Sequence, residues 1–138
     1  MRVFLDASIL FSAAKSDGAV RFLLRQLIEQ GHVCWADAYV VAEARRNLAT
    51  TGPQALHVLD ALLPRLSIAA AAPLPTDLAD LEWLPEKDRP VLAAAIRRRC
   101  DALATGDRTH FGAGYGRVFG GVAIHTPRSL AESLLVQD

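Results

Sequence analysis

Four acidic residues have the type and spacing that metal-assisted chemistry requires: Asp6, Glu43, Asp88 and Asp107. Asp6 directly follows the apolar run Arg2-Val3-Phe4-Leu5, and Asp107 lies two residues after Thr105, which ends a second compact run. Short apolar runs are typical of buried strands in a parallel sheet, whose ligands bind outside the carboxyl ends of the strands. We therefore expect Asp6 and Asp107 at the same edge of a sheet. Two carboxylates held close together repel each other, and a bound cation would remove that penalty.

The other two acids are placed by helical patterns. Asp88 begins an apolar stripe at helical spacing that continues through Val91, Leu92, Ala95 and Ile96. Glu43 lies inside a second predicted helix, among Val40, Val41, Ala44 and Leu48. A charge on or beside an apolar face costs free energy unless it is paired or bound to a metal. Four acids on four separate elements therefore predict one shared site.

Each of three acids also has a structural interpretation. Asp88 could act as the N-cap of its helix, and Asp107 could be an ordinary turn aspartate. Glu43 could pair with Arg46 or Asn47, one helical turn further along. The carboxylate that ends the first apolar run has few such uses, because a buried strand offers it no ordinary partner.

Strands and helices alternate along the chain in a pattern typical of a parallel α/β sheet covered on both faces. Asp37 is the predicted N-cap of the helix that carries Glu43. The predicted strands span residues 2–5, 32–35, 66–71, 101–105 and 122–124. The predicted helices span residues 20–30, 38–48, 53–63, 76–84 with Thr76 as its cap, 88–99, and a terminal helix that Pro127 opens. We expect one domain, residues 1–138, because nothing linker-like divides the chain.

Composition limits the classes of protein that remain. About half of the 138 residues are apolar, which suffices for one core, and no apolar run is long enough to span a bilayer. Asp6 interrupts the N-terminal apolar stretch, so we expect a cytoplasmic protein without a signal peptide or membrane association. Cys34 and Cys100 lack metal-site spacing, and buried small side chains are the expected role. The formal net charge of zero leaves a nucleic-acid partner open.

Taken together, these residues resemble the PIN-domain nucleases, which include the VapC-type toxins of bacterial and archaeal toxin–antitoxin pairs. The similarity runs over nearly the whole chain, and the acids match the family in order and spacing. A glycine-rich stretch between Thr109 and Pro127 is similar to that of a bacterial subgroup. The matching segments are residues 3–10, Ala42-Glu43, residues 87–95 and Leu103-Ala104-Thr105-Gly106-Asp107.

The resemblance implies a Mg²⁺- or Mn²⁺-dependent endoribonuclease with a three-layer α/β/α sandwich around a central parallel sheet. It places Asp6, Glu43, Asp88 and Asp107 at the metal site, with Asp6 and Asp107 as direct ligands in our assignment. Ser8 and Thr105 match polar positions that orient the site. The implied partners are RNA as substrate, a small antitoxin protein and a second copy of the chain in a homodimer.

One position departs from the family pattern. Many members carry a further acid shortly after the position of Asp107, and here that place is occupied by His110. The substitution weakens the expectation of a second metal site and leaves one or two ions open, with His110 either contacting phosphate or serving as a structural or surface residue. Candidate phosphate-binding residues lie next to the acids and are Arg45, Arg46, Arg89 and Arg108.

Two other functions fit parts of the pattern. The chain could be a PIN-fold RNA- or protein-binding module with weak or no catalytic activity, which the neutral net charge and His110 favour. A metal-dependent phosphatase on a related sheet is the third hypothesis. It would normally need a covalent nucleophile or a loop that cradles phosphate, and Thr105-Gly106-Asp107 alone does not supply one.

Overall fold

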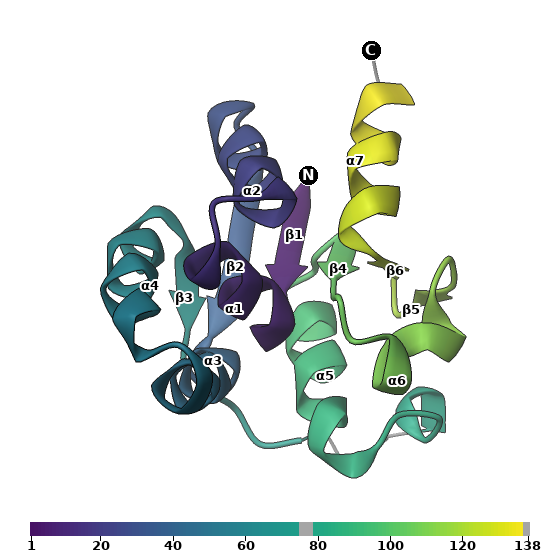
Figure 1. Ribbon diagram of the computed structural model, residues 1–138. Helices are drawn as coiled ribbons and strands as arrows, with labels where there is room; N and C mark the ends of the chain where they lie inside the picture. The colour runs from purple at the N-terminus through teal and green to yellow at the C-terminus, as the bar shows by residue number, and fades with distance from the viewer. Residues whose placement is uncertain (75–78, 137–138) are drawn as a thin grey trace.

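The centre of the molecule is a six-stranded sheet in the computed structural model, which describes residues 1–74 and 79–136 (Figure 1). The strand order is β3-β2-β1-β4-β6-β5, and every neighbouring pair is parallel except the last. The strands are β1 (Arg2–Leu5), β2 (Val33–Asp37), β3 (Ser67–Ala69), β4 (Ala102–Ala104), β5 (Val118–Phe119) and β6 (Val122–His125).

Helices lie on both faces of this sheet and complete a three-layer α/β/α sandwich, which confirms the predicted fold class (Figure 1). Helix α1 packs against α2, α3 and α4, while α5 contacts β4 and α7 contacts α2. The helices are α1 (Ala7–Lys15), α2 (Ala19–Glu29), α3 (Ala38–Thr51), α4 (Leu56–Leu62), α5 (Arg89–Arg97), α6 (Arg108–Phe111) and α7 (Pro127–Val136). Five short 3₁₀ turns join them within the described residues: η1 (Pro53–Ala55), η2 (Leu63–Arg65), η3 (Ala79–Leu81), η4 (Glu86–Asp88) and η5 (Gly112–Gly114).

Helix α1 is the main element that the sequence pattern did not predict. Its polar residues Ser8, Ser12 and Lys15 do follow helical spacing, but the segment is short and directly continues the apolar run of β1, which obscures the helical pattern. Five of its nine residues are buried, because the helix fills the space between β1 and its three neighbouring helices. The helix starts directly after Asp6, which means that the first strand delivers Asp6 to a helix N-terminus with no intervening loop.

Two local expectations have different outcomes. Asp37 is the N-cap of α3 as predicted, since its Oδ1 accepts a hydrogen bond from the backbone N–H of Val40 at 3.0 Å. The helix expected over residues 76–84 begins outside the described residues, as does its cap Thr76. Its described remainder holds only η3, so the predicted helix is not seen there.

The sheet reverses its direction of growth between β1 and β4. From β1 the chain adds β2 and then β3 on one side, whereas β4 and β6 extend the sheet on the other side. The pairing sets Phe4 opposite Leu103, and both side chains are fully buried. In an open parallel sheet such a switch point opens a crevice outside the carboxyl ends of the two central strands. Asp6 and Thr105 follow those two ends directly.

None of the helices in the described part of the chain is long and apolar enough to cross a bilayer.

The central strand β4 should dominate stability. Leu103 is completely buried between β1 and β6, so we expect Leu103→Ala to lower the free energy of unfolding by about 2–5 kcal/mol. Ile68→Ala on the edge strand β3 is the matched control, because Ile68 is 46% exposed. Its loss should stay below about 1 kcal/mol. Urea unfolding followed by circular dichroism measures both, and equal losses would contradict the assignment of β4 to the core.

Candidate functional site

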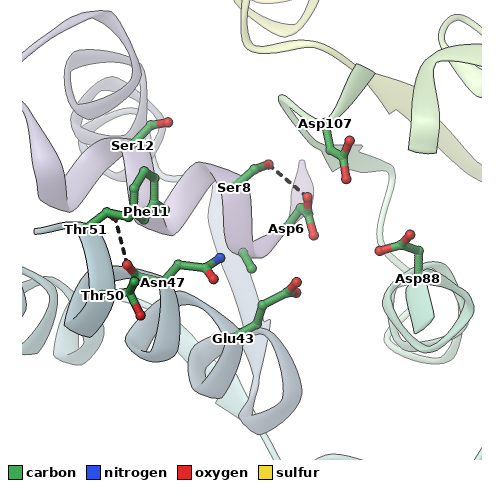
Figure 2. Close-up of a pocket in the computed structure, with 11 residues that line it drawn as sticks. Asp6, Ser8, Phe11, Ser12, Glu43, Asn47, Thr50, Thr51, Asp88 and Asp107 are labelled. Atoms are coloured by element: carbon green, nitrogen blue, oxygen red, sulfur yellow. Dashed lines mark hydrogen bonds between the residues drawn. The ribbon is translucent and has the colours of Figure 1, made fainter. Parts of the chain in front are cut away.

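A cavity of about 420 Å³ opens beyond the carboxyl ends of β1 and β4 (Figure 2). All four acids predicted from the sequence line it, and each comes from a different part of the chain. We call Asp6, Glu43, Asp88 and Asp107 the acid cluster. Figure 2 shows their carboxylates pointing toward one shared space. The remaining lining residues are Ala7, Ser8, Phe11, Ser12, Asn47, Thr50 and Thr51.

Asp6 is held by two hydroxyl groups. Its Oδ2 accepts hydrogen bonds from Ser8 Oγ and Thr105 Oγ1, each at 2.8 Å. The same hydroxyl oxygens accept from the next loop: Gly106 N–H donates to Ser8, and Asp107 N–H donates to Thr105. Asp6 is only 5% exposed, so these contacts replace the water that a buried carboxylate loses. The two residues expected to orient the site therefore connect the end of β1 to the loop after β4.

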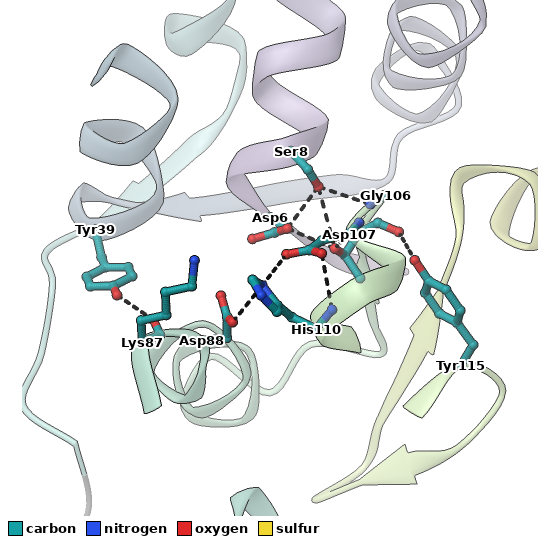
Figure 3. A network of polar contacts seen from close by, with 10 residues as sticks. Asp6, Ser8, Tyr39, Lys87, Asp88, Gly106, Asp107, His110 and Tyr115 are labelled. Atoms are coloured by element: carbon teal, nitrogen blue, oxygen red, sulfur yellow. Dashed lines mark hydrogen bonds and ion pairs between the residues drawn. The ribbon is translucent and has the colours of Figure 1, made fainter. Parts of the chain in front are cut away.

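Asp88 occupies the N-cap position of α5 but makes no capping hydrogen bond with its side chain. The side chain instead lies toward the cavity, where its Oδ2 is 3.1 Å from His110 Nδ1 (Figure 3). Burial raises the pKa of Asp88, and the nearby Asp107 and Asp6 carboxylates add to the increase, while His110 and Lys87 oppose it. The structural interpretation of Asp88 as a cap thus holds for its position and fails for its side chain.

Asp107 has both a structural and a site contact. Its Oδ1 caps α6 by accepting from the backbone N–H of His110 at 3.2 Å. Its Oδ2 lies 2.8 Å from Nδ1 of the same histidine. Asp6, Asp88 and Asp107 therefore stand at the starts of α1, α5 and α6. Unpaired backbone N–H groups give a helix N-terminus partial positive charge, which offsets part of the repulsion among the acids.

Glu43 approaches from α3, on the opposite side of the cavity from Asp107 (Figure 2). Burial raises its pKa, and the Asp6 and Asp88 carboxylates raise it further, whereas Lys87 and Arg46 partly oppose the shift. Among the described residues Glu43 forms no ion pair with Arg46, so the interpretation as a surface pair does not describe it. Its electrostatic environment is set by the acid cluster.

Two tyrosines support the site and were not anticipated. The Tyr39 hydroxyl donates to the backbone carbonyl of Lys87, which ties α3 to the segment before Asp88 (Figure 3). The Tyr115 hydroxyl donates to the carbonyl of Thr105 at 2.9 Å. Burial raises the pKa of both, and neighbouring carboxylates add to the shift. Their sequence positions lack any local signal, because each bonds to a backbone carbonyl on another element.

Most of the other residues that line the cavity lie at helical spacing from Glu43 on α3 or from Ser8 on α1. Asn47, Thr50 and Thr51 lie four, seven and eight residues after Glu43, which places all of them on one face of α3. Phe11 and Ser12 lie three and four residues after Ser8 on α1 in the same way. This spacing could have identified the wall from the sequence once the first residue of each face was chosen.

The four arginines proposed as phosphate ligands have different surroundings, and none lines the cavity. Arg45 forms an ion pair with Asp60 at 2.8 Å. Arg89 donates to the backbone carbonyls of Leu84 and Glu82. Arg46 and Arg108 are exposed and close enough to the site to influence Glu43 and Tyr115, respectively. Lys87 is a further cation beside Glu43 and Asp88.

The donor set suits a divalent ion. Hard ions such as Mg²⁺ bind carboxylate oxygens and water, and the acid cluster offers several carboxylates in one cavity. Oδ2 of Asp88 is buried and has no hydrogen-bond partner within residues 1–74 and 79–136. Asp88, Asp107 and His110 each bring one ligand atom to within 4.8 Å of the others. The residues present therefore fit a metal ion, with Asp6 and Glu43 on the same cavity wall.

The raised pKa of Glu43 predicts a pH-dependent gain from its removal. The folded protein binds this proton more tightly than the unfolded chain, whose glutamates titrate near 4.5, so stability falls as pH rises through that window. The full loss of stability from Glu43 applies above the pKa of this group in the folded protein. In metal-free buffer, Glu43→Gln should therefore melt above wild type at neutral pH, and the difference should shrink as pH falls toward 4.5.

Thermal unfolding over a pH series measures this difference. Glu132→Gln is the matched control, because Glu132 lies in an exposed ion pair on α7 and should change the melting temperature little. A Glu43→Gln variant that melts below wild type at neutral pH would contradict the electrostatic description of the site.

Comparison with known proteins places this architecture in a family. No curated protein matches the chain significantly by sequence. Among solved structures, VapBC2 from Rickettsia felis, bound to a DNA fragment from its promoter, matches with 19% identity and a TM-score of 0.67, covering 91% of this chain and 98% of that chain. VapC20 from Mycobacterium tuberculosis, a toxin that cleaves the sarcin–ricin loop, matches with 15% identity and a TM-score of 0.58, covering 84% and 98%. VapBC-1 from nontypeable Haemophilus influenzae matches with 12% identity and a TM-score of 0.59, covering 93% and 99%.

At these identities the structural matches establish the fold alone. The family model for the PIN domain, however, matches residues 2–109, a stretch that contains the whole acid cluster and most of the chain. The sheet order, the cavity at its switch point and the four acids that line it agree with that match. The chain belongs to the PIN domain family.

Proposed function

We propose that this protein is a divalent-metal-dependent endoribonuclease that hydrolyses RNA phosphodiester bonds. The observation that carries the proposal is the convergence of four carboxylates from four elements in one cavity at the switch point of the sheet. Such a concentration of negative charge lowers stability unless a cation is bound, so the arrangement is best explained by the ion it would hold.

Mg²⁺ or Mn²⁺ is the proposed ion, with Asp6 and Asp107 as direct ligands and Asp88 and Glu43 acting through water. When bound, the ion lowers the pKa of water and neutralises charge that develops on the phosphate. Ser8 and Thr105 hold Asp6 through hydrogen bonds, so its carboxylate is already oriented when the ion binds.

Glu43 is the proposed proton acceptor for the attacking water. Burial and the neighbouring carboxylates raise its pKa, which makes it a stronger base than an ordinary glutamate. Lys87 and the exposed Arg46 are close enough to lower the pKa of Glu43, and both would attract the phosphate backbone. Arg45 and Arg89 are committed to Asp60 and to backbone carbonyls, so we give them no part in substrate binding. The resemblance to PIN-domain nucleases implies products with a 5′-phosphate and a 3′-hydroxyl.

The choice of RNA and of a biological role rests on relatives of the same fold. VapC20 is a toxin that cleaves the sarcin–ricin loop, an RNA element, and VapBC2 and VapBC-1 were solved as VapBC proteins. We propose that this chain acts in the cytoplasm as the toxin of a type II pair, with a small antitoxin protein as partner. Light scattering of the purified chain tests the homodimer that the resemblance implied.

The decisive variant is Asp6→Asn, which keeps the shape of a residue that two hydroxyls hold in the cavity wall. We expect wild type to cleave RNA with Mg²⁺ or Mn²⁺ and to stop on addition of EDTA. Asp6→Asn should lose at least about 100-fold in rate while remaining folded by circular dichroism. Asp17→Asn, at an exposed residue that does not line the cavity, is the matched control and should retain full activity.

Three outcomes decide the proposal. Equal cleavage by wild type and Asp6→Asn would assign the activity to a contaminating nuclease. Cleavage of single-stranded DNA in preference to RNA would replace the substrate. Tight binding of RNA with no cleavage under any divalent ion would favour the binding module that the sequence left open.

A further inference from the structure

Three side chains meet beside the cavity in a group that hydrogen bonding alone does not explain. Nδ1 of His110 lies 3.1 Å from Oδ2 of Asp88 and 2.8 Å from Oδ2 of Asp107 (Figure 3). One ligand atom from each residue lies within 4.8 Å of the other two. Asp88 precedes α5, whereas Asp107 and His110 begin α6, so two separate elements supply the group.

Two of these atoms lack a directed hydrogen bond. Oδ2 of Asp88 and Nδ1 of His110 are shielded from solvent, and in the described part of the chain neither has a partner with hydrogen-bond geometry. Their short separation therefore does not represent a well-aligned donor and acceptor. Asp88 is 95% buried, and a buried carboxylate oxygen without a partner costs free energy. The arrangement points to a bound ion that both atoms contact.

The backbone holds this group in place before any ligand binds. The N–H of His110 donates to Oδ1 of Asp107 at 3.2 Å, while the imidazole of the same residue faces Oδ2. One turn of α6 thus anchors one oxygen of the carboxylate and presents the other together with a ring nitrogen. Contacts that orient ligands in this way are typical of metal sites.

We propose that His110 is a metal ligand through Nδ1 and that it biases the site toward first-row transition ions over Mg²⁺. The inference rests on the proposed function, because Asp88 and Asp107 belong to the acid cluster that would hold the ion. Mg²⁺ prefers oxygen ligands, whereas imidazole nitrogen suits transition ions, for which affinity rises from Mn²⁺ to Co²⁺ to Ni²⁺. In this arrangement Asp88 binds the ion directly instead of through water, and two carboxylates with one imidazole favour Mn²⁺ or Co²⁺ over Mg²⁺.

Pulsed electron paramagnetic resonance on the Mn²⁺-loaded protein tests the ligand directly. We expect the strong ¹⁴N coupling of a directly bound imidazole in wild type. The coupling should disappear in His110→Asn, whose amide offers an oxygen in place of the ring nitrogen. His57→Asn, at an exposed histidine on α4, is the matched control and should keep the wild-type signal.

Calorimetric titration of the metal-free protein tests the selectivity. Wild type should bind Mn²⁺ and Co²⁺ at least about tenfold more tightly than Mg²⁺. His110→Asp leaves only oxygen ligands, so it should strengthen Mg²⁺ binding. The preference for Mn²⁺ and Co²⁺ over Mg²⁺ should then fall by about tenfold or more. This variant also provides the comparison if His110→Asn does not fold.

The outcomes separate this inference from the proposed nuclease. Wild type that holds one Mn²⁺ without a directly bound nitrogen would overturn the role of His110 and leave the nuclease proposal intact. Equal affinity of wild type for Mg²⁺ and Mn²⁺ would overturn the selectivity alone. Failure of wild type to bind any of the three ions would overturn both proposals.

Discussion

The parallel pairing of β1 with β4 is the interaction on which the site depends. It extends one step past the strands, where the Asp6 N–H donates to the carbonyl of Ala104 and the Thr105 hydroxyl donates to Asp6. The same step delivers Asp107 from the loop after Thr105. Because this pair also lies where the sheet reverses its direction of growth, the crevice and its first carboxylates arise from one structural feature.

The acid cluster opposes the stability that this pairing supplies. Burial and mutual repulsion raise the pKa values of Glu43 and Asp88. Keeping these carboxylates charged therefore costs the folded protein free energy. The fold limits the penalty locally: hydroxyl groups bond Asp6, and three helices direct their N-termini toward the acids. Uncompensated charge retained in this way is typical of sites that bind a ligand.

Membership of the PIN family and the chemistry of this site are separate statements. The same fold can carry different activities, and the residues in the cavity determine which chemistry is feasible. Here the acids offer oxygen atoms of the kind that divalent ions bind, and Nδ1 of His110 lies close to two of them. That one residue distinguishes the site of this chain from the pattern of acids that the sequence resembles, and in our proposal it influences the choice of ion.

The sequence by itself determined the features that depend on short segments. The apolar runs before Asp6 and Thr105 marked two central strands, and strand ends place their acids at one edge regardless of the other contacts. The N-cap role of Asp37 was equally local. Only the tertiary structure revealed α1, a short helix that directly continues the apolar run of β1, and the position of His110 against Asp88.

The tertiary structure also decided the role of Arg45, because its partner Asp60 lies on another helix. In each of these cases the deciding contact joins residues far apart in the chain. Such contacts arise from packing of complete elements, and no local pattern encodes them.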